Sequence, residues 1–136
     1  MSNGRFSISL HILTLLDQGK DELLSSEYLA GSININPVLV RKEIANLKKH
    51  GLVESKEGKA GGFTLGKPSR QISLAEIYKA VQKAPLLGHQ KNKPNPKCLV
   101  GKQIDQHLDA LFIDAEEALV KRLGKTTLAD FAKKFY

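Results

Sequence analysis

The sequence predicts a mainly α-helical fold with one small β-hairpin, and three observations lead to this expectation. Apolar residues recur at spacings of three and four along most of the chain, as they do on one face of a helix. Strand-like runs are confined to residues 52–55 and 62–65, with Gly58-Lys59-Ala60-Gly61 between them. A long helical pattern over residues 100–123 follows a segment that is interrupted by prolines.

The first helix is predicted over residues 5–17. Its apolar side chains cover most of the circumference, which is typical of a helix buried between other elements. Gly19 is the expected stop. His11 lies among the apolar positions, and we expect a hydrogen-bonded structural histidine rather than a ligand.

Two capped helices with a short turn between them are predicted next. Ser25 or Ser26 caps a short helix of residues 27–31, because a serine hydroxyl accepts a hydrogen bond from a free backbone N–H there. After the turn, Asn36 and Pro37 supply a preferred N-cap and a preferred first helical residue.

The second of these helices is predicted to have two different faces and to end at Gly51. Apolar residues at helical spacing are expected to point inward, namely Leu39, Val40, Ile44 and Leu47. Much of the remaining surface carries Val38, Arg41, Lys42, Ala45, Lys48 and Lys49. The outer face is therefore basic.

The hairpin after this helix is the candidate wing. Its tip is small and conformationally permissive, so that the backbone there can approach a phosphate or enter a groove. A helix-turn-helix followed by a wing places a basic helix beside a basic loop, which suits duplex DNA. A further helix begins near Leu74 and carries Ile77, Ala80 and Val81.

The C-terminal part is predicted to be a linker and two helices. A helix of about 24 residues is about 36 Å long, so a core of this size cannot cover its whole apolar stripe. That stripe consists of Ile104, Leu108, Leu111, Phe112, Ala115, Ala118 and Leu119. We expect a homodimer to bury the remainder; the alternative is a helix lying across its own domain. Thr126 or Thr127 caps a last short helix bearing Leu128, Phe131 and Phe135.

The expected organisation is therefore a winged helix-turn-helix domain over residues 1–83, a basic linker over 84–99 and dimerisation helices over 100–136. The linker lysines Lys91, Lys93 and Lys97 are either solvated or in contact with DNA flanks.

Composition limits the functional classes. The net charge is +7, and residues 79–102 contain six lysines and no acidic residue, which favours an anionic partner such as nucleic acid. No apolar run approaches a membrane span of about 20 residues and no secretory signal is seen, so we expect a cytoplasmic protein without membrane contact. No phosphate-binding loop, HExxH motif or nucleophile elbow occurs, which argues against an enzyme.

Several short pieces of the chain, in this order and spacing, resemble the Rrf-two (Rrf2) family of winged-helix transcription regulators. These pieces are Gly4-Arg5-Phe6, Tyr28-Leu29-Ala30, the run from Leu47 to Ser55, the loop from Gly58 to Phe63, and Thr127-Leu128-Ala129-Asp130. The resemblance extends from Arg5 to about Phe131. It implies a homodimer on a partly palindromic operator, with recognition helices in the major groove and wings near the minor groove.

The resemblance also implies a set of DNA-binding residues. The start of the recognition helix corresponds to Asn36, Val38, Leu39, Arg41 and Lys42. The start of the preceding helix, where phosphate contacts are made, corresponds to Ser25 and Ser26. The wing corresponds to Lys59, Gly61 and Gly62. Arg41 is the candidate base reader, since a guanidinium can bond both acceptors of guanine, and the alternative is a phosphate contact or a place near Glu43. Glu57 stands where the family commonly has an arginine, so Lys56 and Lys59 are expected to supply the charge of the wing.

Several family members bind an iron–sulfur cluster through three cysteines, of which Cys98 matches the last, whereas Asn92 and Leu86 occupy the other two places. A cluster typically takes four ligands, so we expect no cluster and no metal. Cys98 is a candidate redox thiol, because Lys97 and a following helix N-terminus favour the thiolate. The alternative is an inert, packed remnant of a ligand set.

The sequence thus predicts a sequence-specific DNA-binding transcription regulator, acting as a homodimeric repressor. The alternative is a winged-helix protein-interaction module without DNA affinity. The effector, whether a small molecule or a partner protein, is left open.

Overall fold

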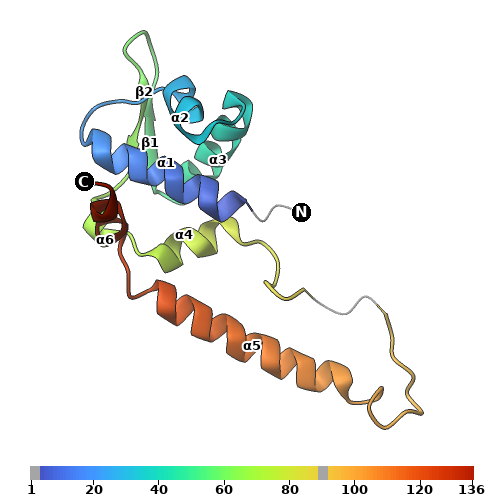
Figure 1. Cartoon of the computed structure of the whole chain (residues 1–136). Helices are drawn as coiled ribbons and strands as arrows, with labels where there is room; N and C mark the ends of the chain where they lie inside the picture. The colour runs from blue at the N-terminus through green and yellow to red at the C-terminus, as the bar shows by residue number, and fades with distance from the viewer. Residues whose placement is uncertain (1–3, 89–91) are drawn as a thin grey trace.

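The computed structural model describes residues 4–88 and 92–136. Its elements are α1 (Arg5–Gly19), α2 (Ser26–Ile33), α3 (Pro37–Lys49), β1 (Val53–Lys56), β2 (Gly62–Leu65), the 3₁₀ turn η1 (Ser69–Gln71), α4 (Leu74–Val81), α5 (Ile104–Leu123), α6 (Leu128–Ala132) and the 3₁₀ turn η2 (Lys133–Phe135). Figure 1 shows α1, α2, α3, the hairpin, α4 and α6 gathered in one body, with α5 extending beyond it. The mainly helical fold with a small hairpin is confirmed.

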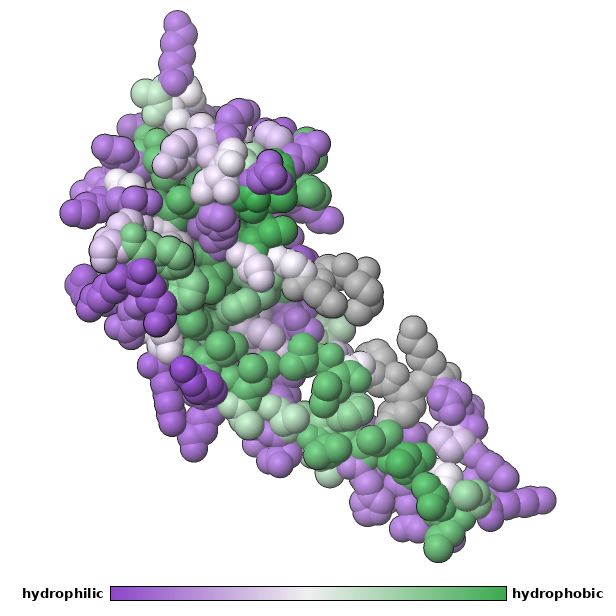
Figure 2. Space-filling model, in the orientation of Figure 1, coloured by the Kyte–Doolittle hydropathy of each residue, from purple (hydrophilic) through white to green (hydrophobic). Residues whose placement is uncertain are grey.

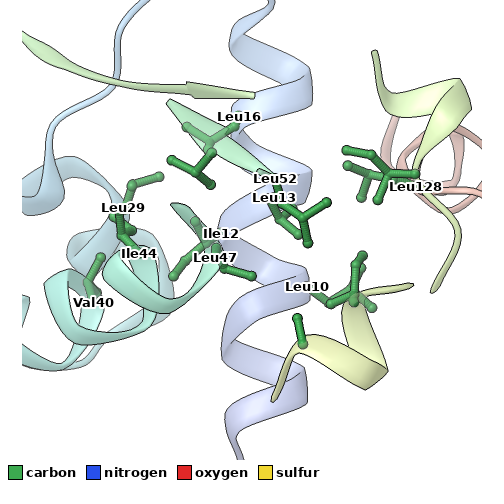
Figure 3. Close-up of a cluster of buried hydrophobic side chains, with 14 of the residues drawn as sticks. Leu10, Ile12, Leu13, Leu16, Leu29, Val40, Ile44, Leu47, Leu52 and Leu128 are labelled. Atoms are coloured by element: carbon green, nitrogen blue, oxygen red, sulfur yellow. The ribbon is translucent and has the colours of Figure 1, made fainter. Parts of the chain in front are cut away.

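Helix α1 forms the centre of the core, as its nearly continuous apolar surface predicts. Ile12, Leu13 and Leu16 are fully buried, and the helix packs against α2, α3, α4, α6 and β2. Figure 3 shows side chains of α1 lying between α2 and α3 on one side and Leu128 of α6 on the other. The predicted structural role of His11 also holds, because its Nε2 atom lies 3.0 Å from the hydroxyl oxygen of Ser32.

Local capping chemistry fixes the helix-turn-helix. Ser25, rather than Ser26, caps α2, and its Oγ accepts the N–H of Tyr28 at 3.0 Å. Asn36 caps α3 by accepting the N–H of Val38 at 2.8 Å, and a proline occupies the first helical position. Gly51 takes φ +76° just after α3, the left-handed conformation that the sequence led us to expect.

The prediction that Leu39 points inward is wrong. Its side chain is 49% exposed, whereas Val40, Ile44 and Leu47 are buried. The buried face of α3 is completed by Glu43. Leu39 precedes Val40 by one residue and is therefore turned by about 100° around the helix, which leaves it on the solvent side of the first turn.

The hairpin is antiparallel, with Val53 opposite Leu65 and Lys56 opposite Gly62. Its first strand begins one residue later than predicted. Its base is tied to the segment before α2 by two hydrogen bonds between Leu24 and Phe63, at 3.0 and 2.8 Å. A Cβ atom on Gly62 would meet the carbonyl oxygen of Leu24 at 2.8 Å, so this position requires glycine.

Helix α5 begins at Ile104, four residues later than predicted. Residues 95–103 form turns instead, in which Cys98 donates its N–H to Asn95 and accepts that of Lys102. No residue of α5 is buried. It packs on α4, where Tyr78 donates a hydrogen bond to Glu116 at 2.8 Å. Burial and this bond raise the pKa of Tyr78 to about 12.

Helix α6 packs in the winged-helix core, although the sequence analysis grouped it with the dimerisation helices. Leu128 is fully buried, and α6 contacts α1. Thr127, rather than Thr126, is the cap, and it forms a reciprocal capping box with Asp130. Among the described residues, no helix is long and apolar enough to span a membrane.

Candidate nucleic-acid interface

The outer side of the first two turns of α3 brings together most of the predicted recognition residues. Asn36 lies at its start, Val38 and Leu39 are 60% and 49% exposed, and Arg41 and Lys42 are exposed one turn further on. The capping bond of Asn36 holds the turn in place. The arrangement presents two apolar and two cationic side chains together.

Arg41 is held at the junction of α2 and α3. Its Nη1 donates to Ser26 Oγ at 3.2 Å and lies 3.6 Å from a carboxylate oxygen of Glu27. The suggested place near Glu43 is wrong, because Glu43 is buried on the other face of α3 and pairs with Arg5. The Arg41 side chain stays 49% exposed, so a fork of several N–H donors remains open to solvent.

The two predicted phosphate-contacting serines have different surroundings. Ser25 is exposed, and its hydroxyl oxygen caps α2. Ser26 is buried, and its hydroxyl group bonds to Arg41 and Glu27. Ser25 therefore lies at the surface, whereas Ser26 positions the arginine behind it.

The wing projects from the same end of the molecule as α2 and α3 (Figure 1). Lys59 is exposed near its tip, beside the exposed Glu57. Gly61 and Gly62 are half-buried, and the close approaches that demand glycine there are to the chain itself: to the carbonyl oxygen of Lys56 for Gly61 and to that of Leu24 for Gly62. The need for glycine at these two positions is therefore explained by contacts within the chain and does not by itself indicate a phosphate contact.

One group of interacting residues at this site was not predicted. Arg5 donates to both carboxylate oxygens of Glu43, at 2.9 and 3.0 Å, and to the carbonyl oxygen of Val81 at 3.3 Å. The hydrogen bond to Glu43 raises the pKa of Arg5. Glu43 is a charged residue within an otherwise apolar helical face, and this was the signal in the sequence. The pair fixes α3 against α1 and the end of α4.

A second unpredicted contact joins the recognition helix to the wing. Lys48 Nζ donates to Ser55 Oγ at 2.6 Å, from the last turn of α3 to β1. The sequence predicted Lys48 on the basic outer face of this helix. Its ammonium group also links the two basic elements.

The iron–sulfur ligand set is incomplete in this chain. Cys98 is exposed in the turns of residues 95–103, six residues before α5, so the expected helix N-terminus beside it is not there. In the part of the chain that the structure describes, no group of three or more His, Cys, Asp or Glu could hold a metal ion. One thiol does not fit a cluster that takes about four protein ligands.

Comparison with known proteins shows which family this chain is similar to. The model of the Rrf2 family, described as "Iron-dependent Transcriptional regulator", matches residues 2–134. The HTH-type transcriptional regulator YwnA of Bacillus subtilis is 42% identical over 130 residues, which make up 96% of each chain.

Solved structures show the same architecture. A crystal structure of a DNA-binding protein is 38% identical with a TM-score of 0.75, covering 93% of this chain and 97% of its own. CymR, the global cysteine regulator of B. subtilis, is 22% identical with a TM-score of 0.74, covers all of this chain and 98% of its own, and shows the fold alone. Together with the exposed basic helix and the wing, the match over nearly the whole chain leads to one conclusion: the protein belongs to the Rrf2 family of transcriptional regulators, and not to a family of enzymes.

Proposed function

We propose that this chain is a homodimeric repressor that reads a partly palindromic operator, with α3 in the major groove and the wing near the minor groove. The observation that carries the proposal is the exposed leading part of α3, where Arg41 and Lys42 lie on the same end of the molecule as the wing. A helix N-terminus that reaches base edges is the usual geometry of recognition by this motif.

In this proposal the residues have separate roles. Arg41 bonds a guanine edge, and the two surface groups Ser25 and Lys42 bond phosphates. Lys59 supplies positive charge at the wing. Because chromosomal DNA is the partner, we place the protein in the cytoplasm.

The dimer is supported by the uncovered apolar stripe of α5. Leu111 is 57% exposed, and Ala115 and Ala118 beside it on the helix are exposed as well. Figure 2 shows hydrophobic surface that follows α5 away from the core. A second copy packed on this stripe buries it and presents two recognition helices to two half-sites.

We also infer that this protein works without an iron–sulfur cluster, since Asn92 and Leu86 replace two of the three expected cysteines. Protein purified without oxygen is expected to be colourless and free of iron. A visible cluster absorption band with stoichiometric iron contradicts this inference.

A response that depends on Cys98 is tested by peroxide treatment of Cys98→Ser beside the parent protein, with operator binding as the readout.

The test of the proposed function is binding to the duplex upstream of the protein's own gene, against a scrambled duplex, at several salt concentrations. Tighter binding to the upstream duplex with a steep salt dependence indicates that this duplex contains an operator. The slope of the affinity with salt concentration then gives the number of phosphate contacts. If neither this duplex nor any enriched from a random pool is bound at low salt, the protein-interaction module replaces the proposal. Repression itself, which rests on analogy with small regulators, predicts more transcript from the bound promoter when the gene is deleted.

A further inference from the structure

We propose that the first turn of α3 reads thymine 5-methyl groups through Val38 and Leu39, so that each operator half-site carries thymine where this turn meets the bases. The proposal rests on the proposed function, because it requires α3 in the major groove. It adds what no contact described so far specifies, namely which base the turn selects and by what chemistry.

The first step is the exposure of these two side chains. Val38 is 60% and Leu39 is 49% exposed, although Val40 directly after them is fully buried. A single exposed apolar residue is ordinary on a protein surface. Two adjacent ones in the leading turn of the recognition helix stand where such helices meet base edges.

The second step is that two polar side chains next to these apolar residues already have partners within the protein. The side-chain oxygen of Asn36 accepts the N–H of Val38 at 2.8 Å. The guanidinium of Arg41, one turn on, is held by Ser26 and Glu27. The first turn of α3 therefore offers the groove two apolar side chains, whereas the partly exposed Arg41 and the exposed Lys42 lie one turn further on.

The third step is the chemistry of the groove. The thymine 5-methyl group is the apolar feature that distinguishes base pairs in the major groove, and small apolar side chains recognise it by contact. Val38 is suited to this because its branched side chain is restricted at χ1 in a helix. The capped, proline-led start of α3 keeps the backbone of that turn in one position.

The experiment removes the methyl group alone. Each thymine of a bound operator half-site is replaced in turn by deoxyuridine, which pairs identically but lacks the 5-methyl group. Burial of one methyl group is worth about 0.8 kcal/mol, so Kd is expected to rise about fourfold at one or two positions and to stay unchanged at the others.

Variants connect the effect to the residues. In Val38→Ala and Leu39→Ala, thymine and deoxyuridine duplexes should bind equally at the position that each residue contacts. Alanine has a higher helix propensity than valine, so Val38→Ala should fold, which circular dichroism verifies. Lys49→Ala, at the far end of α3, is the control. This variant should bind the thymine and deoxyuridine duplexes more weakly by the same factor and keep the sensitivity to the methyl group.

The outcomes separate the two proposals. Failure to prefer any duplex overturns the proposed function. A protein that prefers its operator but binds every deoxyuridine duplex as tightly as the parent overturns the thymine-methyl proposal alone. Sensitivity that persists in both alanine variants also overturns it, since another residue then reads the methyl group.

Discussion

Two arginines form contacts between α3 and its neighbouring helices. These contacts fix the position of α3 and of the cationic side chain that it exposes. Arg5 binds the buried carboxylate of Glu43 from α1, whereas Arg41 is steadied by Ser26 and Glu27 from α2. One contact lies behind α3 and the other beside it. The contact of Arg5 stabilises the fold, and the contacts of Arg41 place a cation at the exposed surface of α3.

Replacing Glu43 by glutamine should lower the free energy of unfolding by roughly 2–3 kcal/mol, because a partly buried charge-assisted pair is lost and Arg5 keeps its charge without a carboxylate beside it. Urea unfolding measures the change. Glu54→Gln, at an exposed position of β1, is the matched control and should stay within about 0.5 kcal/mol of the parent. Equal stability of the two variants would show that the pair contributes nothing net.

Replacing Arg41 by alanine should cost about 1–3 kcal/mol on the operator and relax the preference at a single guanine position. Fluorescence titration against operators with that base pair changed provides the measurement. Lys49→Ala should weaken binding to all of these duplexes alike and reduce the salt slope. Unchanged affinity and preference in Arg41→Ala would remove Arg41 from base reading.

At the scale of elements, the wing and α6 depend on particular local contacts. The wing is anchored where Gly62 passes the backbone of Leu24, next to the paired bonds between Leu24 and Phe63. Helix α6 is short, and its start is fixed by the reciprocal bonds of Thr127 and Asp130. Each element therefore has one position at which a small change should disturb it.

Gly62→Ala should destabilise the protein by at least ~1 kcal/mol and weaken DNA binding, because the new methyl group cannot fit against the carbonyl oxygen of Leu24. Gly31→Ala is the control: it lies within α2, where a Cβ meets nothing within 4 Å. That variant should be more stable than the parent by about 0.5–1 kcal/mol. Thermal unfolding compares the two; a tolerated Gly62→Ala contradicts the packing argument.

The capping box of α6 should make stability depend on acid pH. Hydrogen bonds from the backbone and side chain of Thr127 lower the pKa of Asp130 from its ordinary value of 3.8. A carboxyl group whose pKa is lower in the folded state adds stability above the unfolded value, and this is lost as pH falls. The difference in Tm between the parent and Asp130→Asn should therefore shrink below pH 3.8. A difference that is constant with pH would exclude this origin.

At the scale of the whole molecule, the winged-helix body and α5 differ in how they are covered. The body encloses its core around α1, whereas α5 extends beyond it without a buried residue. The uncovered stripe around Leu111 lies away from the side on which Glu116 meets Tyr78. A monomer therefore leaves an apolar surface that a second copy can bury.

Leu111→Glu should weaken the proposed dimer by roughly 100-fold or more, because a carboxylate is placed within the proposed apolar contact. Light scattering coupled to size-exclusion chromatography measures the mass. Ala110→Glu introduces the same charge on the polar side of α5 and should leave the dimer intact. Operator binding should fall only for Leu111→Glu, since two linked half-site contacts are lost together. If Leu111→Glu is still a dimer, the stripe around Leu111 is not the dimer interface.

The sequence by itself determined the α-helices, the hairpin and their order, because the signals are local. The serine before α2, Asn36-Pro37 before α3 and Gly51 after it act within a few residues, so each can be recognised without knowing the rest of the fold. The basic outer face of α3, with Arg41 and Lys42, follows from the same helical spacing. These signals suffice for a helix-turn-helix and a wing.

Only the tertiary structure decided which side chains of the site are free and which are engaged. The Arg5–Glu43 pair joins residues 38 positions apart, and the burial of Ser26 depends on how α2 meets α3. Leu39 faces solvent because packing against α1 and α2 selects the face of α3 that carries Val40, and Gly62 is needed because Leu24 passes beside it. Contacts between distant segments set these outcomes, and helical spacing along one segment carries no information about its neighbours.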